Sequence, residues 1–383
     1  MKGLKNVNAY IEGKGFIKTD IEVLDGKIGG IAQGIVNEEL VKIDDNQIVV
    51  PGFIDEHIHG ALGADAMDGN IKALKDMAKA LASEGTTTFL ATTMTQSPEN
   101  IKNALNAVKE YINLKSEEGA EVLGVHLEGP FISPKHIGAQ PLEYVAAPSV
   151  ETMKKYVEYS GNNIKIVSLA PEMEGAEELI KYLKENKIVA SIAHTGAKYK
   201  DCENAVKWGA TNVTHTYNAQ TGLHHRDVGV VGSALLFDEL SCEIICDLIH
   251  VSAPAIKLVV KNKPLDKVIL ITDSMRAKHM PDGESELGGQ LVIVKNGEAR
   301  LVDGTLAGSV LKLNNSIKNV HQVVGVPLEN AIEFATKNPA KNLGIYDSVG
   351  SIESGKRANF AVLNKDTFEV IYTIRDGKII YKK

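Results

Sequence analysis

The stretch IVVPGFIDEHIH at residues 48–59 is the part of the chain from which the fold is inferred. It is rich in β-branched residues and ends in two histidines that are separated by one residue. Further short apolar runs follow it, with stretches of helical character such as 71–85 and 98–119 between most of them. The later runs are TTTFLATT (86–93), EVLGVHLE (121–128), IKIVSLAP (164–171), KIVASIAHT (187–195), TNVTHT (211–216), EIICDLIH (243–250) and KVILITD (267–273). Alternating strands and helices favour a parallel sheet covered by helices, and eight strands predict an α/β fold of the closed (β/α)8, TIM-like barrel type.

The two ends of the chain show a different pattern. Residues 1–50 and 350–383 contain short strand-like pieces, and each end has an Asp-Gly-Lys-Ile step, at 25–28 and at 376–379. Asp-Gly between apolar runs is a strong hairpin signal. We therefore predict that both termini join in one small β-sandwich domain, beside a barrel domain over residues 51–349.

One further β segment interrupts the barrel pattern after the eighth run. It is GGQLVIVKNGEARLV at residues 288–302, and its Asn-Gly dipeptide at 296–297 is typical of a two-residue hairpin turn. The segment is predicted to be a β-hairpin inserted near the mouth of the barrel.

Composition excludes several classes of protein. The 383 residues are 44% hydrophobic and 24% charged, as in a soluble globular protein, and the formal net charge of −7 argues against a nucleic-acid partner. The most apolar stretch, VGVVGSALLF at 228–237, is too short to span a bilayer, and no signal peptide is visible. Three cysteines without a pairing pattern favour a reducing compartment, so a cytoplasmic protein is expected.

Six side chains that are able to bind a metal or transfer a proton lie at the ends of predicted strands. His57 and His59 share one face of the first strand, because alternate residues point the same way. The others end the third, fifth, sixth and eighth runs: Glu128, His194, His215 and Asp273. The carboxyl ends of barrel strands form the active site in this fold, so all six are predicted to meet there.

Each candidate also has a structural interpretation. A lone histidine is usually a surface residue or a satisfied core group, and this is the expectation for His136, His224, His225, His279 and His321. His126 is expected to be a structural partner of Glu128, and Asp273 in LITDSM is expected to cap a turn if it is not catalytic. Arg276 and Lys278 are expected to be an exposed basic pair, with assistance to an anionic substrate as the alternative.

Six motifs occur in order along the chain. They are PGFIDEHIHG (51–60), HLEGPFISP (126–134), AHTGA (193–197), THTYNAQTGLHHRDVGVVG (214–232), ITDSM (271–275) and LGGQ…DGTLAGS (287–309). Together they resemble the N-acetylglucosamine-6-phosphate deacetylases, a family of the amidohydrolase superfamily. The resemblance runs from about residue 50 to the C-terminus. It implies hydrolysis of N-acetyl-D-glucosamine 6-phosphate to D-glucosamine 6-phosphate and acetate, in amino-sugar catabolism or recycling.

The resemblance also implies roles for particular residues. Glu128, His194 and His215 match the ligands of the metal that holds the hydrolytic water, and Asp273 matches the general base and acid. His57 and His59 match the ligands of a second metal, with Glu128 bridging, so one or two divalent ions per subunit, zinc or iron, are expected. The residues that match substrate contacts are Ala139, Gln140, Asn218, Ala219, Arg226, His250, Leu306, Ala307 and Gly308. The arginine matching Arg226 reaches the neighbouring active site in the family, which implies a homodimer.

Departures from the family pattern leave alternatives open. Many relatives have histidine at the position of Gln140, and many read HHREPG where this chain has HHRDVG at 224–229. The epimeric substrate N-acetylgalactosamine 6-phosphate therefore stays possible. Cyclic-amide hydrolases use a carboxylated lysine on the fourth strand, where only Lys165 is present near the start. A catalytically silent scaffold protein is the remaining alternative, although all six metal and acid–base positions are filled.

Overall fold

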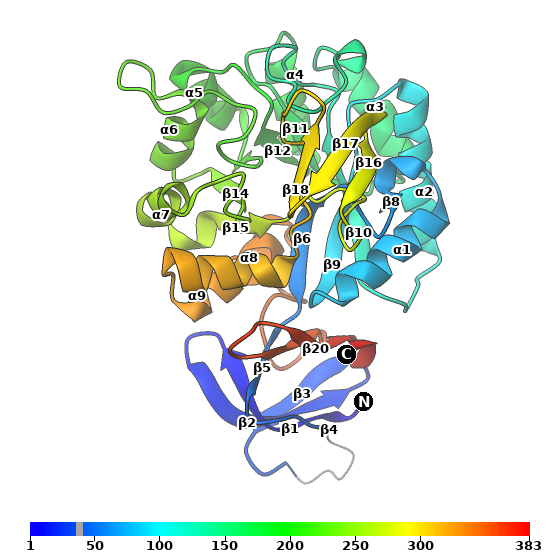
Figure 1. Ribbon diagram of the computed structural model, residues 1–383, viewed down its shortest axis with the longest axis vertical. Coiled ribbons are helices and arrows are strands. Elements are labelled where there is room, and N and C mark those ends of the chain that lie inside the picture. The colour runs from blue at the N-terminus through cyan, green and yellow to red at the C-terminus, as the bar shows by residue number, and fades with distance from the viewer. Residues whose placement is uncertain (36–40) are drawn as a thin grey trace.

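The computed structural model describes residues 1–35 and 41–383. Residues 36–40, which belong to the predicted terminal domain, lie outside the described residues. Figure 1 shows a large body of strands surrounded by helices and a smaller body of strands that contains both termini. Among the described helices, none combines the length and the apolar character needed to cross a bilayer.

The large body is an eight-stranded parallel barrel, which confirms the predicted fold class. Its hydrogen-bonded order is β15-β14-β13-β12-β11-β10-β9-β6, so neighbours in the sequence are neighbours in the sheet. The strands are β6 (Phe53–Ile58), β9 (Thr86–Thr92), β10 (Glu121–Glu128), β11 (Ile164–Leu169), β12 (Val189–Ile192), β13 (Asn212–Val213), β14 (Ser241–Ile245) and β15 (Val268–Ile271). All eight correspond to runs that the sequence predicts.

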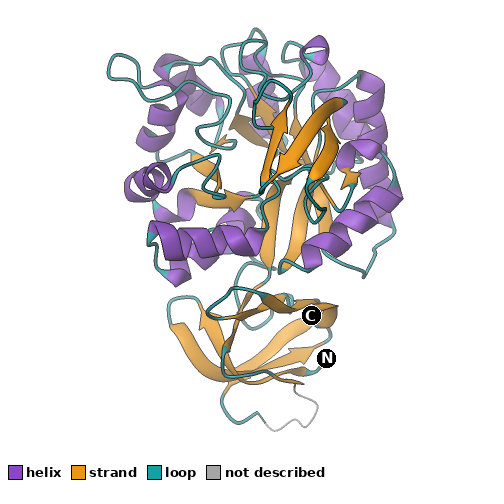
Figure 2. Cartoon of the chain, in the orientation of Figure 1, coloured by secondary structure: helices purple, strands orange, loops and turns teal. Residues whose placement is uncertain are grey.

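Helices cover the outside of the barrel (Figure 2). They are α1 (Ile71–Ala82), α2 (Pro98–Asn113), α3 (Val150–Tyr159), α4 (Ala176–Glu185), α5 (Tyr199–Trp208), α6 (Gly229–Leu236), α7 (Ala253–Asn262), α8 (Leu313–Asn319), α9 (Leu328–Glu333) and α10 (Lys337–Asn342). In α4 the buried positions are Ala176, Leu179, Ile180 and Leu183, a spacing that places them on one helix face. The side chain of Asn70 caps α1, and Ser97 caps α2.

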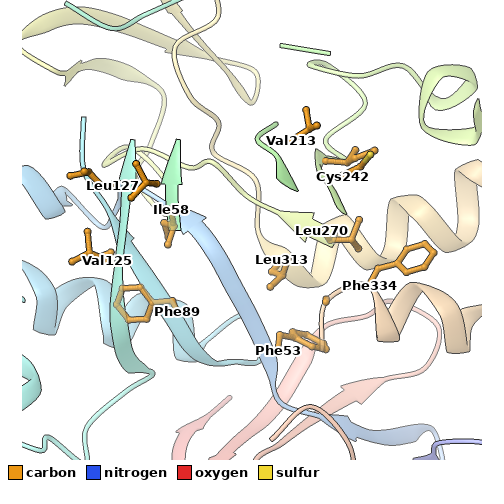
Figure 3. Packing of buried hydrophobic residues seen from close by; sticks show 14 of the residues in the cluster. Phe53, Ile58, Phe89, Val125, Leu127, Val213, Cys242, Leu270, Leu313 and Phe334 are labelled. Carbon is orange, nitrogen blue, oxygen red and sulfur yellow. The ribbon is translucent and has the colours of Figure 1, made fainter. Parts of the chain in front are cut away.

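Apolar side chains from strands and helices fill the space between the barrel wall and its cover. Figure 3 shows Phe53, Phe89 and Val125 on three neighbouring strands, with Leu313 of α8 and Phe334 after α9 packed nearby. All five are fully buried. This core fixes the positions of the strand ends that carry the candidate site.

Hydrogen bonds between β6 and β15 close the barrel at its carboxyl end. The backbone N–H of Asp273 donates to the carbonyl of His57 at 2.8 Å, and the N–H of His59 donates to the carbonyl of Ser274 at 2.9 Å. Lower in the same gap, the Thr272 hydroxyl donates to a carboxylate oxygen of Asp55 at 2.6 Å. The closure therefore brings Asp273 directly beside the two histidines of the first strand.

The predicted first strand, residues 48–59, is divided between the two bodies. Its first half is β5 (Gln47–Pro51) in the terminal sheet, and its second half is β6 in the barrel. The change occurs at Gly52, where a Cβ atom would lie only 2.3 Å from the side chain of Thr87. Only glycine therefore allows the chain to pass so close to β9 at this point.

The terminal sheet contains strands from both ends of the chain, as predicted. Its strands pair as one eight-stranded sheet in the order β21-β20-β19-β5-β1-β2-β3, with β4 on β1. They are β1 (Gly3–Ile11), β2 (Gly15–Leu24), β3 (Lys27–Ala32), β4 (Val41–Lys42), β5, β19 (Phe360–Asn364), β20 (Val370–Arg375) and β21 (Lys378–Lys382). The Asp-Gly steps at 25–26 and 376–377 form the expected turns, because Leu24 pairs with Lys27 and Arg375 with Lys378. The exact domain boundaries at 50/51 and 349/350 stay a proposal.

A three-stranded antiparallel sheet lies at the barrel mouth. It consists of β16 (Gly283–Leu287), β17 (Gln290–Lys295) and β18 (Glu298–Leu301). The predicted hairpin is β17 and β18, with Lys295 and Glu298 paired on either side of the Asn296-Gly297 turn. A short antiparallel pair, β7 (Gly60–Ala61) and β8 (Ala64–Asp65), follows the first barrel strand.

Candidate metal centre and active site

The six predicted site residues meet at the carboxyl end of the barrel. His57 lies in β6 and His59 directly after it, and Glu128 is the last residue of β10. His194, His215 and Asp273 each lie two residues beyond their strands, β12, β13 and β15. The backbone of these three residues has positive φ angles of 42°, 30° and 46°, a conformation that costs about 1–3 kcal/mol each for residues with a side chain. Such strained conformations often occur at functional sites.

The first candidate metal cluster contains Glu128, His194 and His215. One oxygen of Glu128, Oε1, lies 3.2 Å from Nε2 of His194 and 3.0 Å from Nε2 of His215. The two histidine nitrogens are 3.1 Å apart. Two imidazole nitrogens and a carboxylate oxygen that converge on one point are the donor set of a catalytic divalent metal.

The second candidate cluster contains His57, His59 and Glu128. Nε2 of His59 lies 3.2 Å from Oε2 of Glu128 and 3.2 Å from Oδ1 of Asp273. Nε2 of His57 lies 3.6 Å from Oε1 of Glu128 and, among the described residues, has no hydrogen-bond partner although it is buried. Buried polar atoms normally have a partner, so a cation bound at this nitrogen fits the arrangement.

The charges at the site stabilise one another. Burial by itself raises the pKa of Glu128, but the surrounding histidines, His57 first, hold this pKa well below its usual range. For Asp273, burial is likewise outweighed by His57 and His59, which lower the pKa to about 2. Burial lowers the pKa of His215, whereas the carboxylate of Glu128 raises it to about 9. Both carboxyl groups are therefore anionic at neutral pH, as a metal ligand and a general base must be.

A cavity of about 210 Å³ opens above the two clusters. Most of the predicted substrate-contact residues line it, namely Ala139, Gln140, Asn218, Ala219, His250, Leu306 and Gly308. Ala307 lies between two of these residues but is buried, and its N–H donates to the carbonyl of Ala299 in β18. Arg226 is not part of the cavity, because it lies on an exposed loop where its guanidinium contacts His225 at 2.9 Å. Met94, Leu287 and Thr305 also line the cavity, and the sequence analysis did not select them.

Gln140 contacts the central carboxylate. Its side-chain N–H donates to Oε2 of Glu128 at 2.7 Å, and its amide oxygen accepts from the N–H of Thr95 at 2.7 Å. The two bonds fix the orientation of the amide. Gln140 therefore holds Glu128 in place, in addition to lining the cavity.

Sequence analysis missed two buried carboxyl groups beneath the site. Glu243 of β14 lies 3.1 Å from Nδ1 of His57, and Glu56 of β6 lies next to Glu243. Burial raises the pKa of Glu243 to about 8 and that of Glu56 well above its usual range. The signal in the sequence was a glutamate at the start of the apolar run EIICDLIH. A buried strand rarely contains such a residue unless it has a partner.

Hydrogen bonds fix the rings of two further histidines: His126 through both of its nitrogens and His250 through one. Both ring nitrogens of His126 are used, at 2.9 Å from the carbonyl of Glu56 and 2.8 Å from the hydroxyl of Ser168, in agreement with the expected structural role. Nδ1 of His250 lies 2.6 Å from a carboxylate oxygen of Asp247. His250 therefore keeps its other nitrogen for the cavity that it lines.

Among the remaining histidines, one contacts a residue of the candidate clusters. His136 provides the carbonyl that lies 3.0 Å from Nδ1 of His194, whereas the side chains of His224 and His225 belong to an exposed loop. His279 contacts Glu84 at 2.7 Å, and His321 contacts the carbonyl of Val326 at 2.8 Å. These rings lie outside both candidate clusters.

The expectation of an exposed basic pair at Arg276 and Lys278 is wrong. Lys278 is fully buried and forms an ion pair of 2.9 Å with Glu84, which is also fully buried. Arg276 is only partly exposed and lies 3.0 Å from Asp68 and 3.1 Å from Glu286 of β16. Both cations are therefore paired within the fold.

Comparison with known proteins agrees with this geometry. The model of the amidohydrolase family matches residues 48–380. The chain therefore belongs to the amidohydrolase family. It is 43% identical, over 94% of its own length and 92% of the relative, to the N-acetylglucosamine-6-phosphate deacetylase of Bacillus subtilis (strain 168). It is also 34% identical, over 90% of each chain, to the N-acetylgalactosamine-6-phosphate deacetylase of Escherichia coli O157:H7.

Solved structures support the same assignment. The N-acetylglucosamine-6-phosphate deacetylase of Thermotoga maritima superimposes over 100% of both chains with a TM-score of 0.89 and 34% identity. The Mycobacterium smegmatis enzyme of that name, with one aspartate replaced by alanine and N-acetyl-D-glucosamine-6-phosphate bound, superimposes over 100% of both chains with a TM-score of 0.92 and 25% identity. The resemblance that the motifs indicate is thereby confirmed.

Proposed function

We propose that this protein hydrolyses the acetamido group of N-acetyl-D-glucosamine 6-phosphate, which yields D-glucosamine 6-phosphate and acetate for amino-sugar catabolism or recycling. The observation that carries the proposal is the position of Asp273, which faces both histidine–carboxylate clusters on the floor of a cavity. The relatives named as deacetylases and the substrate complex of the M. smegmatis enzyme support it.

The two clusters fit divalent metal ions. Glu128, His194 and His215 would hold one ion, and His57 and His59 would hold a second with Glu128 between them. Imidazole and carboxylate donors suit zinc and iron, which are the ions we propose. A bound ion of this kind lowers the pKa of water toward about 7 and polarises the amide carbonyl.

Asp273 is suited to both proton transfers of amide hydrolysis. Its carboxylate is anionic and lies beside the metal-ligand histidines, so it can accept a proton from the attacking water. Once protonated, the same carboxyl group can donate that proton to the departing sugar nitrogen. Ions held by the two clusters would supply the activated water, and Asp273 would carry its proton to the leaving group.

Phosphate recognition is proposed to involve a second subunit. Arg226 lies outside the cavity of its own chain on an exposed loop, where it is available to a neighbouring molecule. A guanidinium binds phosphate through two parallel hydrogen bonds. We therefore propose a homodimer in which Arg226 reaches the active site of the partner, with Asn218 and Ala219 contacting the substrate within each chain. His250 is proposed to contact the reacting amide.

The protein is proposed to work in the cytoplasm. Its three cysteines, Cys202, Cys242 and Cys246, are buried and unpaired, as is usual in a reducing compartment.

The alternatives to deacetylation of N-acetylglucosamine 6-phosphate fit the site less well. Among the described residues that line the cavity there is no lysine, so the carboxylated lysine of cyclic-amide hydrolases has no counterpart. The filled metal and acid–base positions argue against a catalytically silent scaffold. Deacetylation of N-acetylgalactosamine 6-phosphate is the second candidate, because one relative of 34% identity has that name.

Acetate release from three compounds tests the proposal. We expect hydrolysis of N-acetylglucosamine 6-phosphate in preference to its galactosamine epimer, and little hydrolysis of the unphosphorylated sugar. A preference for the epimer would keep the mechanism and replace the substrate. No release from any of the three by metal-loaded protein would contradict the proposed function.

A further inference from the structure

The ring of His57 has a buried carboxylate behind it. Nδ1 of His57 lies 3.1 Å from Oε2 of Glu243, and neither side chain is accessible to solvent. The other nitrogen, Nε2, faces Glu128 and Asp273 in the second cluster. The two nitrogens therefore have separate partners, one beneath the site and one within it.

Glu243 is itself held by a chain of polar contacts. Its carboxyl group lies beside that of Glu56, which is fully buried, and among the described residues its Oε1 has no hydrogen-bond partner. The far side of Glu56 accepts from the amide of Asn342, at 3.0 Å and 3.1 Å for its two oxygens. Asn342 is the last residue of α10, so this chain of contacts connects the outer helix to the ligand.

The nearby His126 is not free to bind a metal ion, because both of its ring nitrogens are already engaged. His57, His126 and Glu243 lie close enough together to be considered a metal-binding group. However, one nitrogen of His126 contacts the carbonyl of Glu56 and the other contacts Ser168. Together with the contact between His57 and Glu243, these bonds describe a support for His57 and no additional ion.

We propose that Glu243, braced by Glu56 and Asn342, is the positioning residue of the second metal site. A carboxyl oxygen that accepts a hydrogen bond from Nδ1 keeps the imidazole proton on that nitrogen and leaves the lone pair of Nε2 directed toward the site. His194 has the equivalent support in the first site, from the carbonyl of His136 at 3.0 Å. This inference rests on the proposed function, because it takes the cluster of His57, His59 and Glu128 as a metal site.

Zinc titration of the metal-free protein tests the inference. Bound zinc per chain and the Kd of each ion are measured for the wild type and for Glu243→Leu. We expect the wild type to bind two ions. In the variant, the Kd of the second ion should rise about 10- to 100-fold, as is usual when an outer partner of a ligand is removed, while the first ion is unaffected.

Two further variants separate orientation from packing. Glu243→Gln keeps an amide oxygen that accepts from Nδ1 of His57, so it should retain the second ion far better than Glu243→Leu. Equal loss in both variants would overturn the role of this hydrogen bond. Asn342→Ala, at a partly exposed position, should weaken the second ion alone and serves if Glu243→Leu does not fold.

The outcomes distinguish this inference from the proposed function. Two ions bound with unchanged affinity in Glu243→Leu, or in Asn342→Ala if the former does not fold, would overturn the positioning role. A wild-type protein that binds a single ion would also overturn it, even if acetate release is normal. If the wild-type protein binds two ions but releases no acetate, that result would instead count against the proposed function.

Discussion

At the scale of single residues, Glu128 is the centre of the site because both of its oxygens are engaged. Oε1 faces His194 and His215, and Oε2 faces His59 and accepts from Gln140. A carboxylate with so many neighbours has one orientation. Glu128 therefore belongs to both candidate metal clusters, and a change at Glu128 is expected to affect both.

Asp273→Asn should chiefly reduce turnover. The amide keeps the shape of the carboxylate but cannot accept the proton, so we expect kcat to fall by about 10²- to 10⁴-fold. Steady-state kinetics on the metal-loaded variant, with bound metal measured alongside, checks this. Near wild-type kcat with metal bound would contradict the role of Asp273.

Arg226→Ala provides the contrasting case. Loss of a charged hydrogen bond of about 1.5–3 kcal/mol should raise KM by about 10- to 100-fold and leave kcat largely unchanged. Steady-state kinetics on the metal-loaded Arg226→Ala protein measures both constants. Losses of kcat as large as those of Asp273→Asn would show that binding and chemistry are not divided between these residues as proposed.

The sequence was sufficient to predict which side chains meet at the carboxyl ends of the strands. His57, His59 and Asp273 could be selected because strand periodicity and the barrel architecture place them at one edge. Glu243 and Lys278 were different. Their partners, His57 and Glu84, are distant in the sequence, and a pattern of neighbouring residues carries no information on such pairs.

At the scale of elements, the gap between β6 and β15 depends on polar side chains. Asp55 bonds to Thr272 within the gap, and the ion pair of Lys278 and Glu84 is buried nearby. Glu84 also accepts from the N–H of Leu313 at the start of α8, at 3.0 Å. The side chains thus connect α1, α8 and the closing strands where backbone pairing is limited.

Lys278→Met should therefore destabilise the protein strongly. Removing Lys278 leaves the buried Glu84 with only His279 and the N–H of Leu313 as partners, and the expected loss in the free energy of unfolding is about 3–5 kcal/mol. Lys72→Met, in an exposed pair with Asp76, is the matched control and should leave the free energy of unfolding almost unchanged.

Denaturant unfolding of the wild type and of both single variants measures the loss in the free energy of unfolding. The double variant Lys278→Met with Glu84→Gln should recover part of the loss, because no buried charge remains. Similar small effects for Lys278→Met and Lys72→Met would mean that the buried pair contributes little.

Two elements show what periodicity alone does not reveal. The run at 48–59 was predicted as one strand because its apolar pattern is continuous, yet it changes sheets at Gly52. The strand β16 was not predicted, because GESEL is polar and four of its five residues are exposed or partly exposed. It forms through pairing with β17, which is a tertiary effect.

At the scale of the whole molecule, the terminal sheet lies at the end of the barrel opposite the site (Figure 1). The Thr373 hydroxyl donates to the carbonyl of Ala82 at 2.6 Å, and the Arg375 guanidinium donates to that of Gly119 at 2.8 Å. Arg357 lies 2.6 Å from Glu121 at the start of β10. These contacts support the amino-terminal ends of the strands, so the terminal sheet does not cover the mouth of the barrel.

Mixed dimers test the proposed assembly. If Arg226 acts on the neighbouring site, an equal mixture of Arg226→Ala and Asp273→Asn chains should recover about a quarter of wild-type activity at low substrate concentration, since half of the dimers contain one complete site. Subunits must be allowed to exchange before the assay. Activity equal to the average of the separate variants would show that Arg226 does not act across a dimer.

The pairing of β5 with β19 has a consequence for the timing of synthesis. β5 ends at residue 51 and β19 begins at residue 360, so the ribosome adds about 300 residues between them. At about 5–20 residues per second, this takes about 15–60 s. During that interval the β5 edge is without its neighbour, while the first barrel strands are already emerging. Sequences that slow translation of the barrel would lengthen this exposure, and a nascent chain is most open to misassembly at this edge.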